Sequence, residues 1–70
     1  MDEKELNKRF DYHAPKPGQP EKYTVIRNSI KEVAEVIVSA CPDSRERNTA
    51  LTKLEEAMFW ANASIARNEE

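Results

Sequence analysis

Aromatic and basic side chains alternate along the first half of the chain, in a pattern that could bind a nucleotide. Tyr12 and His13 fall in a proline-rich segment, and each offers a flat ring on which a base could stack. Lys22, Arg27 and Lys31 follow on a predicted helix, where their charges could contact phosphates. The sequence therefore suggests a candidate ligand-binding site made of these five residues.

The same residues also fit a purely structural interpretation. Tyr23 begins an apolar seam and is predicted to pack in the core, Tyr12 could hold the loop down, and the basic side chains could simply be solvated. From Lys8 to Lys31 there are six basic and two acidic residues, although the whole chain has a net charge of −2. That overall charge disfavours binding to duplex DNA. The residue pattern alone leaves both interpretations open.

The residues that most catalytic and metal sites require are scarce. Cys41, His13 and Gly18 are each the sole residue of their type. A structural zinc ion needs about four ligands, and a phosphate-binding loop needs several glycines. Glu55 and Glu56 are adjacent on a predicted helix and so point apart. We therefore expect no enzymatic activity, no metal site and no cofactor.

The positions of prolines and apolar residues predict the elements that carry the candidate site. Apolar residues recur at positions 23, 26, 30, 33, 37 and 40, and again at 51, 54, 58, 61 and 65, as expected for two helices that pack together. Asp43 is the predicted N-cap of the second, and the short link makes the two helices antiparallel neighbours. The sequence thus predicts one all-α domain over residues 1–70: a short helix at 2–10, a proline-rich loop at 11–19, and long helices at 20–41 and 44–68.

The segment Ala57–Ala66 is apolar around its whole circumference, and Asn62 and Ser64 are its only polar residues. A helix of this kind must be buried on all sides, which one hairpin cannot achieve. The alternative is that the short N-terminal helix alone covers this segment, but the apolar residues of that helix, Leu6 and Phe10, offer little surface. We therefore predict a homo-oligomer. A single hairpin is not expected to hold a pocket of about 300 Å³, so any small-molecule site should lie between subunits.

Three further expectations concern surroundings and partners. No charge-free stretch approaches the roughly 20 residues of a membrane span. A single cysteine and an acidic N-terminus without secretory character favour a reducing cytosol. Asn62 and Arg67 could fix helix register or line an assembly centre, and the sequence does not choose between these roles. A helical oligomer that binds a protein partner through its basic N-terminal loop remains an alternative function.

Several segments resemble phage-encoded anti-CBASS proteins, the sponges that sequester cyclic oligonucleotide signals of bacterial immunity. The resemblance runs from Tyr12 to Asn68. It is carried by Tyr12-His13, Gly18-Gln19-Pro20, Tyr23, Ile26-Arg27, the segment Cys41–Arg47 and, most specifically, the segment Leu51–Arg67.

The resemblance implies a compact helical hexamer without catalysis, acting in the host bacterial cytoplasm. Cyclic dinucleotides such as cyclic GMP-AMP would bind at subunit interfaces, with Tyr12 as the stacking ring and Arg27 as a phosphate ligand. Arg67 would belong to a separate site for cyclic trinucleotides. Thr49 and Thr52 would contribute hydroxyl contacts.

Overall fold

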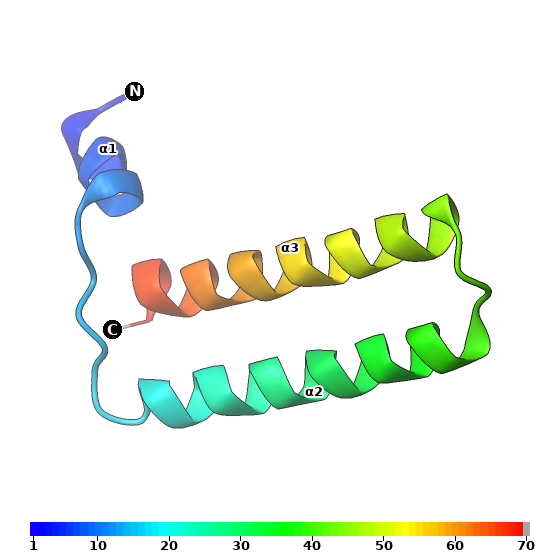
Figure 1. Cartoon of the computed structure of the whole chain (residues 1–70). Coiled ribbons are helices and arrows are strands. Elements are labelled where there is room, and N and C mark those ends of the chain that lie inside the picture. The colour runs from blue at the N-terminus through cyan, green and yellow to red at the C-terminus, as the bar shows by residue number, and fades with distance from the viewer. Residues whose placement is uncertain (70) are drawn as a thin grey trace.

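The computed structural model describes residues 1–69, and its regular structure consists of three helices and no strand: α1 (Glu3–Phe10), α2 (Gln19–Ala40) and α3 (Arg45–Asn68). The predicted all-α fold is confirmed. Helices α2 and α3 run antiparallel as a hairpin, while α1 lies beyond its open end, near the C-terminal end of α3 (Figure 1). None of the described helices combines the length and apolar character that crossing a bilayer requires.

Short-range interactions explain where the helices begin. The Asp2 carboxylate accepts a hydrogen bond from the Glu5 backbone N–H at 2.8 Å and caps α1, at the predicted spacing. Before α2, Gly18 has a φ of 85°, in the left-handed region that favours glycine. Pro20 follows in the first turn of α2, where its missing N–H costs nothing.

The predicted N-cap of α3 was wrong by one residue. Ser44, rather than Asp43, has the extended backbone of an N-cap, and its hydroxyl accepts a hydrogen bond from the Arg47 N–H at 3.1 Å. The Asp43 carboxylate instead pairs with the Arg47 guanidinium at 3.0 Å. The short serine side chain reaches the free N–H directly, which leaves the aspartate to form an ion pair.

The helix-to-helix seam also differs from the predicted one in α2. Along α3 the predicted seam residues are all partly buried. Along α2, however, the partly buried positions are 23, 26, 30, 34 and 37, so Ala34 faces α3 whereas Val33 is 48 % exposed. At 3.6 residues per turn, a step of four residues departs from a full turn by about 40° and a step of three by about 60°, so Ala34 lies closer than Val33 to the helix face of Ile30.

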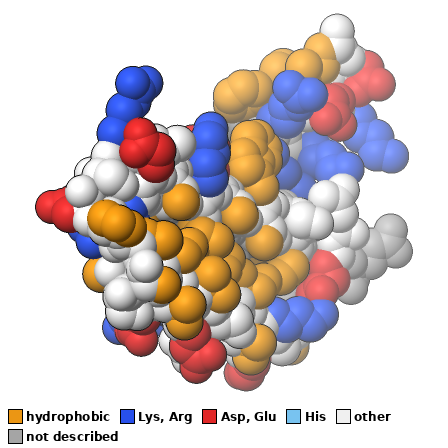
Figure 2. All heavy atoms as spheres, turned by 90° about the vertical axis from the view of Figure 1, so that its right-hand side faces the viewer, with side chains coloured by type: hydrophobic (Ala, Val, Ile, Leu, Met, Phe, Trp, Pro, Cys, Tyr) orange, Lys and Arg blue, Asp and Glu red, His pale blue; other side chains and the backbone are white. Residues whose placement is uncertain are grey.

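A single chain leaves much of its apolar surface uncovered. Among residues 1–69 no hydrophobic side chain is fully buried, and the one buried residue is polar Gln19. On α3, Phe59 and Trp60 are 57 % and 66 % exposed. Hydrophobic atoms accordingly gather on the surface of the hairpin seen from its turn (Figure 2). A lone hairpin therefore lacks a closed core.

Candidate functional site

The C-terminal end of α3, the loop and α1 enclose an open hollow of about 650 Å³, which we call the N-terminal hollow. An adjoining hollow of about 530 Å³ shares several of its residues. Cations outnumber carboxylates in the N-terminal hollow. Its lining residues are Lys4, Asn7, Lys8, Asp11, Tyr12, His13, Lys16, Arg67, Asn68 and Glu69. Three of the predicted site residues, Tyr12, His13 and Arg67, thus come together here.

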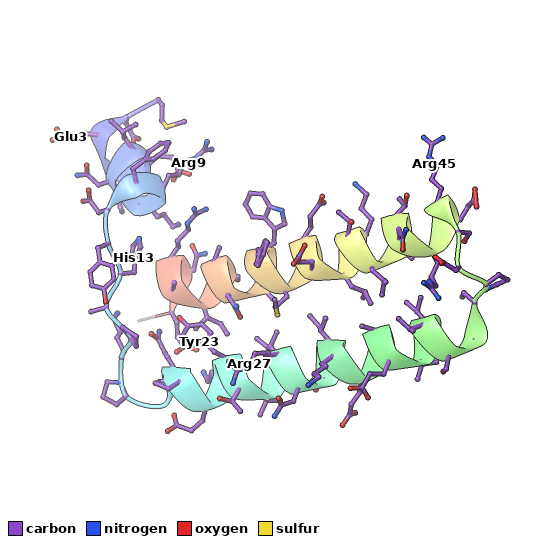
Figure 3. The ribbon with its side chains drawn as sticks, in the orientation of Figure 1. Glu3, Arg9, His13, Tyr23, Arg27 and Arg45 are labelled. Carbon is purple, nitrogen blue, oxygen red and sulfur yellow. The ribbon has the colours of Figure 1, made fainter. Side chains whose placement is uncertain are left out.

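The aromatic residues of the N-terminal hollow differ in how they are held. Tyr12 is 86 % exposed, so the face of its ring is available to stack on a ligand base. The His13 Nε2 lies 2.8 Å from the Lys8 carbonyl oxygen, and because a carbonyl only accepts, this nitrogen carries the proton. In Figure 3, His13 lies in the loop close to the end of α3. The loop therefore presents one free ring and one anchored ring.

Arg67 and His13 together fix the C-terminal end of α1. Arg67 Nη2 donates to the Arg9 carbonyl at 3.4 Å, and His13 contacts the preceding carbonyl, that of Lys8. The last carbonyls of a helix have no partner within it, so cationic and N–H groups stabilise them. The Arg67 contact is long, so the guanidinium retains most of its capacity to bind a phosphate.

A second hollow, the hairpin groove, lies between α2 and α3 and holds three other predicted residues. Its volume is about 390 Å³, and it is lined by Arg27, Ile30, Lys31, Ala34, Leu51, Thr52, Glu55 and Met58. Arg27 is exposed, with one nitrogen 3.5 Å from the Thr24 hydroxyl (Figure 3). The groove thus combines two cations, one hydroxyl and one carboxylate with an apolar floor.

Lys22 and Thr49, also predicted site residues, lie in neither hollow. The Lys22 ammonium forms an ion pair with the Glu69 carboxylate. It borders a shallow apolar groove with Val25, Ile26 and Ile65. The Thr49 hydroxyl donates to the Arg45 carbonyl one turn earlier in α3, at 2.9 Å, which leaves its oxygen free to accept.

The expectation that a single chain has no pocket of about 300 Å³ was wrong. The hairpin groove between α2 and α3 alone measures about 390 Å³, and the loop and α1, which curve around the end of α3, add the larger N-terminal hollow. The structure nevertheless divides the predicted site: Tyr12 and Arg27 line different hollows. Arg27 is eight residues along α2 from Gln19, about 12 Å at 1.5 Å per residue.

Sequence reasoning missed several residues of the N-terminal hollow. Lys4 and Lys8 are one helical turn apart and line it from α1. Their spacing could have identified a common face, but only the folded loop turns that face toward Arg67. No sequence pattern predicted the burial of Gln19, because glutamine is usually exposed and the burial of Gln19 depends on a residue 50 positions away.

The fold and these surfaces define a class: a small helical hairpin whose open end carries an exposed ring beside an excess of cations. The family model described as Acb2/Tad1, hairpin domain, matches residues 1–66. The chain therefore belongs to this family, the anti-CBASS cyclic oligonucleotide sponges. The resemblance found in the sequence is thereby confirmed. No curated protein and no solved structure matched the chain.

Proposed function

We propose that this protein sequesters cyclic oligonucleotide second messengers in the host bacterial cytoplasm without cleaving them, so that CBASS immunity is not triggered. Membership of the sponge family supports this function. The observation that carries it in the structure is the N-terminal hollow, where the exposed Tyr12 ring stands beside several cations. Stacking on a ring and neutralisation of phosphates are the two contacts that a cyclic oligonucleotide needs.

The separation of Tyr12 from Arg27 supports sites completed by two copies of the chain. A cyclic dinucleotide such as cyclic GMP-AMP that stacks on Tyr12 in one chain would meet Arg27 and Lys31 of another. Association is favoured independently, since Phe59, Trp60 and the outer valines of α2 leave water only when a second surface covers them. We propose a homo-oligomer, a hexamer by analogy with the family, that forms these sites.

A second type of site, for cyclic trinucleotides, would use Arg67. Its guanidinium lines the N-terminal hollow from the last turn of α3 and has one long contact there. Thr49 and Thr52, three residues apart on α3, would contribute hydroxyl contacts to ligand in the assembled oligomer. His13 would act at the edge of the dinucleotide site, and Lys22 would act there through its ion pair with Glu69.

Recovery of the ligand tests this function. The protein is mixed with an equimolar amount of cyclic GMP-AMP or, in a parallel sample, of a cyclic trinucleotide, separated from free nucleotide by gel filtration, and denatured by heat. We expect intact nucleotide in near-stoichiometric yield. Cleaved nucleotide would instead indicate an enzyme. No uptake of either cyclic di- or trinucleotides would favour a protein that binds an acidic partner through its basic N-terminal loop.

A further inference from the structure

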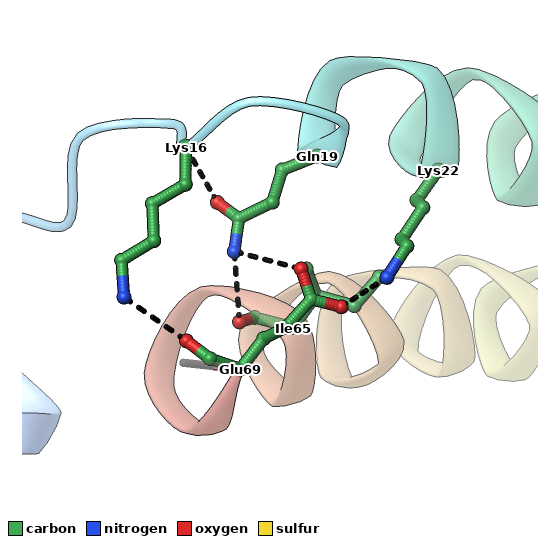
Figure 4. Close-up of polar contacts among 5 residues, drawn as sticks. All are labelled: Lys16, Gln19, Lys22, Ile65 and Glu69. Atoms are coloured by element: carbon green, nitrogen blue, oxygen red, sulfur yellow. Dashed lines mark hydrogen bonds and ion pairs between the residues drawn. The ribbon is translucent and has the colours of Figure 1, made fainter.

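Gln19 is the one fully buried side chain among residues 1–69, at 2 % exposure, and a buried amide requires hydrogen-bond partners. Its Oε1 accepts from the Lys16 backbone N–H at 2.9 Å. Its Nε2 donates to the Glu69 carboxylate at 3.1 Å and to the Ile65 carbonyl at 3.5 Å. One amide thus joins the loop, the start of α2 and the end of α3 (Figure 4).

Two lysines complete this arrangement around Glu69. The Lys16 ammonium donates to the Glu69 carbonyl oxygen at 3.1 Å, and the Lys22 ammonium pairs with its carboxylate. We call these residues the Gln19 cluster: Lys16, Gln19, Lys22, Ile65 and Glu69. Every member contacts Glu69 or Gln19, so the cluster closes the open end of the hairpin.

The cluster lies between the groups that are proposed to bind ligand. On one side, the loop is held at His13 by the Lys8 carbonyl and at Lys16 by Gln19. Prolines at positions 15 and 17 stiffen the span between these anchors. On the other side, Arg67 lies two residues before Glu69. The course of the loop that carries Tyr12 and the place of Arg67 therefore both depend on the hydrogen bonds of the Gln19 cluster.

We propose that Gln19 and Glu69 are positioning residues, which hold the Tyr12 loop and the Arg67 end of α3 in the geometry that binds a cyclic oligonucleotide. In this arrangement Lys22 acts through Glu69 and does not contact the ligand. The inference rests on the proposed function and extends it to Glu69, which lies beyond the residues matched by the family model. Without the cluster, ligand would have to order the loop itself, and affinity would fall.

The first experiment measures the affinity of the full chain for cyclic GMP-AMP by titration calorimetry. We expect Gln19→Leu and Glu69→Gln each to weaken binding roughly 10-fold while light scattering shows an unchanged oligomer. Glu56→Gln is the matched control, because Glu56 is an exposed glutamate of α3 with its own lysine partner, Lys53, at 3.6 Å. We expect that variant to bind like the wild type.

An exchange of the two side chains distinguishes positioning from a general loss of stability. Gln19→Glu alone sets a carboxylate against Glu69 and should weaken binding further than Gln19→Leu does. Combining Gln19→Glu with Glu69→Gln restores an amide opposite a carboxylate, and we expect it to recover most of the affinity. Hydrogen exchange at the Lys16 N–H should be fast in the Gln19→Glu variant and slow again in the variant that carries both exchanged side chains.

A double-variant cycle tests the role given to Lys22. If Lys22 acts through Glu69, the double variant that combines Lys22→Met with Glu69→Gln should bind as tightly as whichever single variant has the lower affinity. If the affinity loss of the double variant is instead the product of the two single-variant losses, Lys22 contacts the ligand directly. That result would contradict this part of the inference.

The outcomes separate this inference from the proposed function. A wild-type chain that binds neither cyclic di- nor trinucleotides overturns both. A wild-type chain that binds, with Gln19 and Glu69 variants that stay within about two-fold of its affinity, overturns only the positioning role. Because Glu69→Gln preserves size at a helix end, that variant should fold even if Gln19→Leu does not.

Discussion

Tyr12 illustrates how exposure at a single residue carries function. The residue is 86 % exposed although aromatic side chains normally gain by burial, so the fold holds an apolar face in water. Residues 1–69 cover little of that face. A stacking partner supplied from outside would therefore recover stabilisation that folding alone leaves unused.

We predict that Tyr12→Ala weakens binding of cyclic GMP-AMP by about 1–3 kcal/mol, while Tyr12→Phe costs much less, because stacking requires the ring and not the hydroxyl. Titration calorimetry of the two variants checks this difference. Equal losses would show that the hydroxyl makes the contact.

Arg27 should act by charge and by geometry. We predict that Arg27→Ala weakens binding roughly 10- to 150-fold, as expected when a charge-assisted contact worth about 1.5–3 kcal/mol is removed. Arg27→Lys should cost less, because it preserves the charge and loses only bidentate geometry. Affinities are to be measured at two salt concentrations.

The control for this series is Arg45→Ala, because Arg45 is exposed at the far end of α3 and points away from the hairpin (Figure 3). Lys16 is unsuitable, although the sequence alone marks it as an ordinary surface base, since its ammonium donates to Glu69. If Arg27→Ala and Arg45→Ala weaken ligand binding by the same small factor, and added salt removes this loss of affinity, Arg27 belongs to a diffuse basic surface.

At the scale of the elements, the loop and the helix ends are joined by a few defined groups. Gly18 turns the chain into α2, Ser44 begins α3, and Glu69 connects the end of α3 to the loop. Each of these groups acts through backbone geometry or hydrogen bonds rather than apolar packing. Their contributions can therefore be tested one at a time.

Gly18→Ala should destabilise the protein by about 1 kcal/mol, because a Cβ is strained at a φ of 85°. The strain comes from the backbone alone, since nothing lies within 4 Å of where the Cβ would be. Gly18→Asn should cost less, because asparagine tolerates the left-handed region. Urea unfolding at one fixed protein concentration measures both, and an asparagine variant no more stable than the alanine variant would contradict this explanation.

The Glu69 contacts should make stability depend on pH in a defined direction. The hydrogen bond from Lys22, and then that from Gln19, lower the pKa of the Glu69 carboxyl below its ordinary value. A lowered pKa in the folded state means that the stabilisation is complete above the unfolded-state value of about 4.3. It is lost as the pH falls through the lower folded-state value.

We therefore predict that Glu69→Gln is less stable than the wild type at neutral pH, and that the difference shrinks as the pH falls below about 4.3. Thermal unfolding of both proteins across this range measures it. Glu56→Gln serves as the reference for an exposed carboxylate in an ordinary ion pair. A difference that stays constant with pH would exclude ionised Glu69 as its source.

For the whole molecule, the absence of any fully buried hydrophobic side chain among residues 1–69 is the dominant fact. A chain of this length buries only about 60% of the surface that its unfolded state exposes, less than larger domains do. Here even the seam between α2 and α3 is only partly closed. Folding and association are therefore expected to be coupled.

We predict that Trp60→Glu dissociates the oligomer and unfolds the chain in the same transition, because each buried Trp60 contributes on the order of 2–3 kcal/mol at an interface. Light scattering and circular dichroism at micromolar concentration follow the two events. Asn48→Glu places the same charge at an exposed position of α3 and should leave assembly intact. A folded wild-type monomer would contradict the prediction.

The sequence by itself determined the features that depend on near neighbours in the chain. Apolar periodicity, the Asp2 cap and the prolines of the loop predicted three helices with ends within one residue of those observed. Several segments between Tyr12 and Asn68, most specifically Leu51–Arg67, indicated the family. These features depend on interactions over three or four residues, which a single sequence displays directly.

The tertiary structure decided which distant residues meet. It selected Ala34 over Val33 for the seam, separated Tyr12 from Arg27, and brought Arg67 to the loop. It also buried Gln19 against Glu69, 50 positions away in the chain. The hairpin creates such contacts only when it closes, because their partners are independent in the unfolded chain and no local pattern records them.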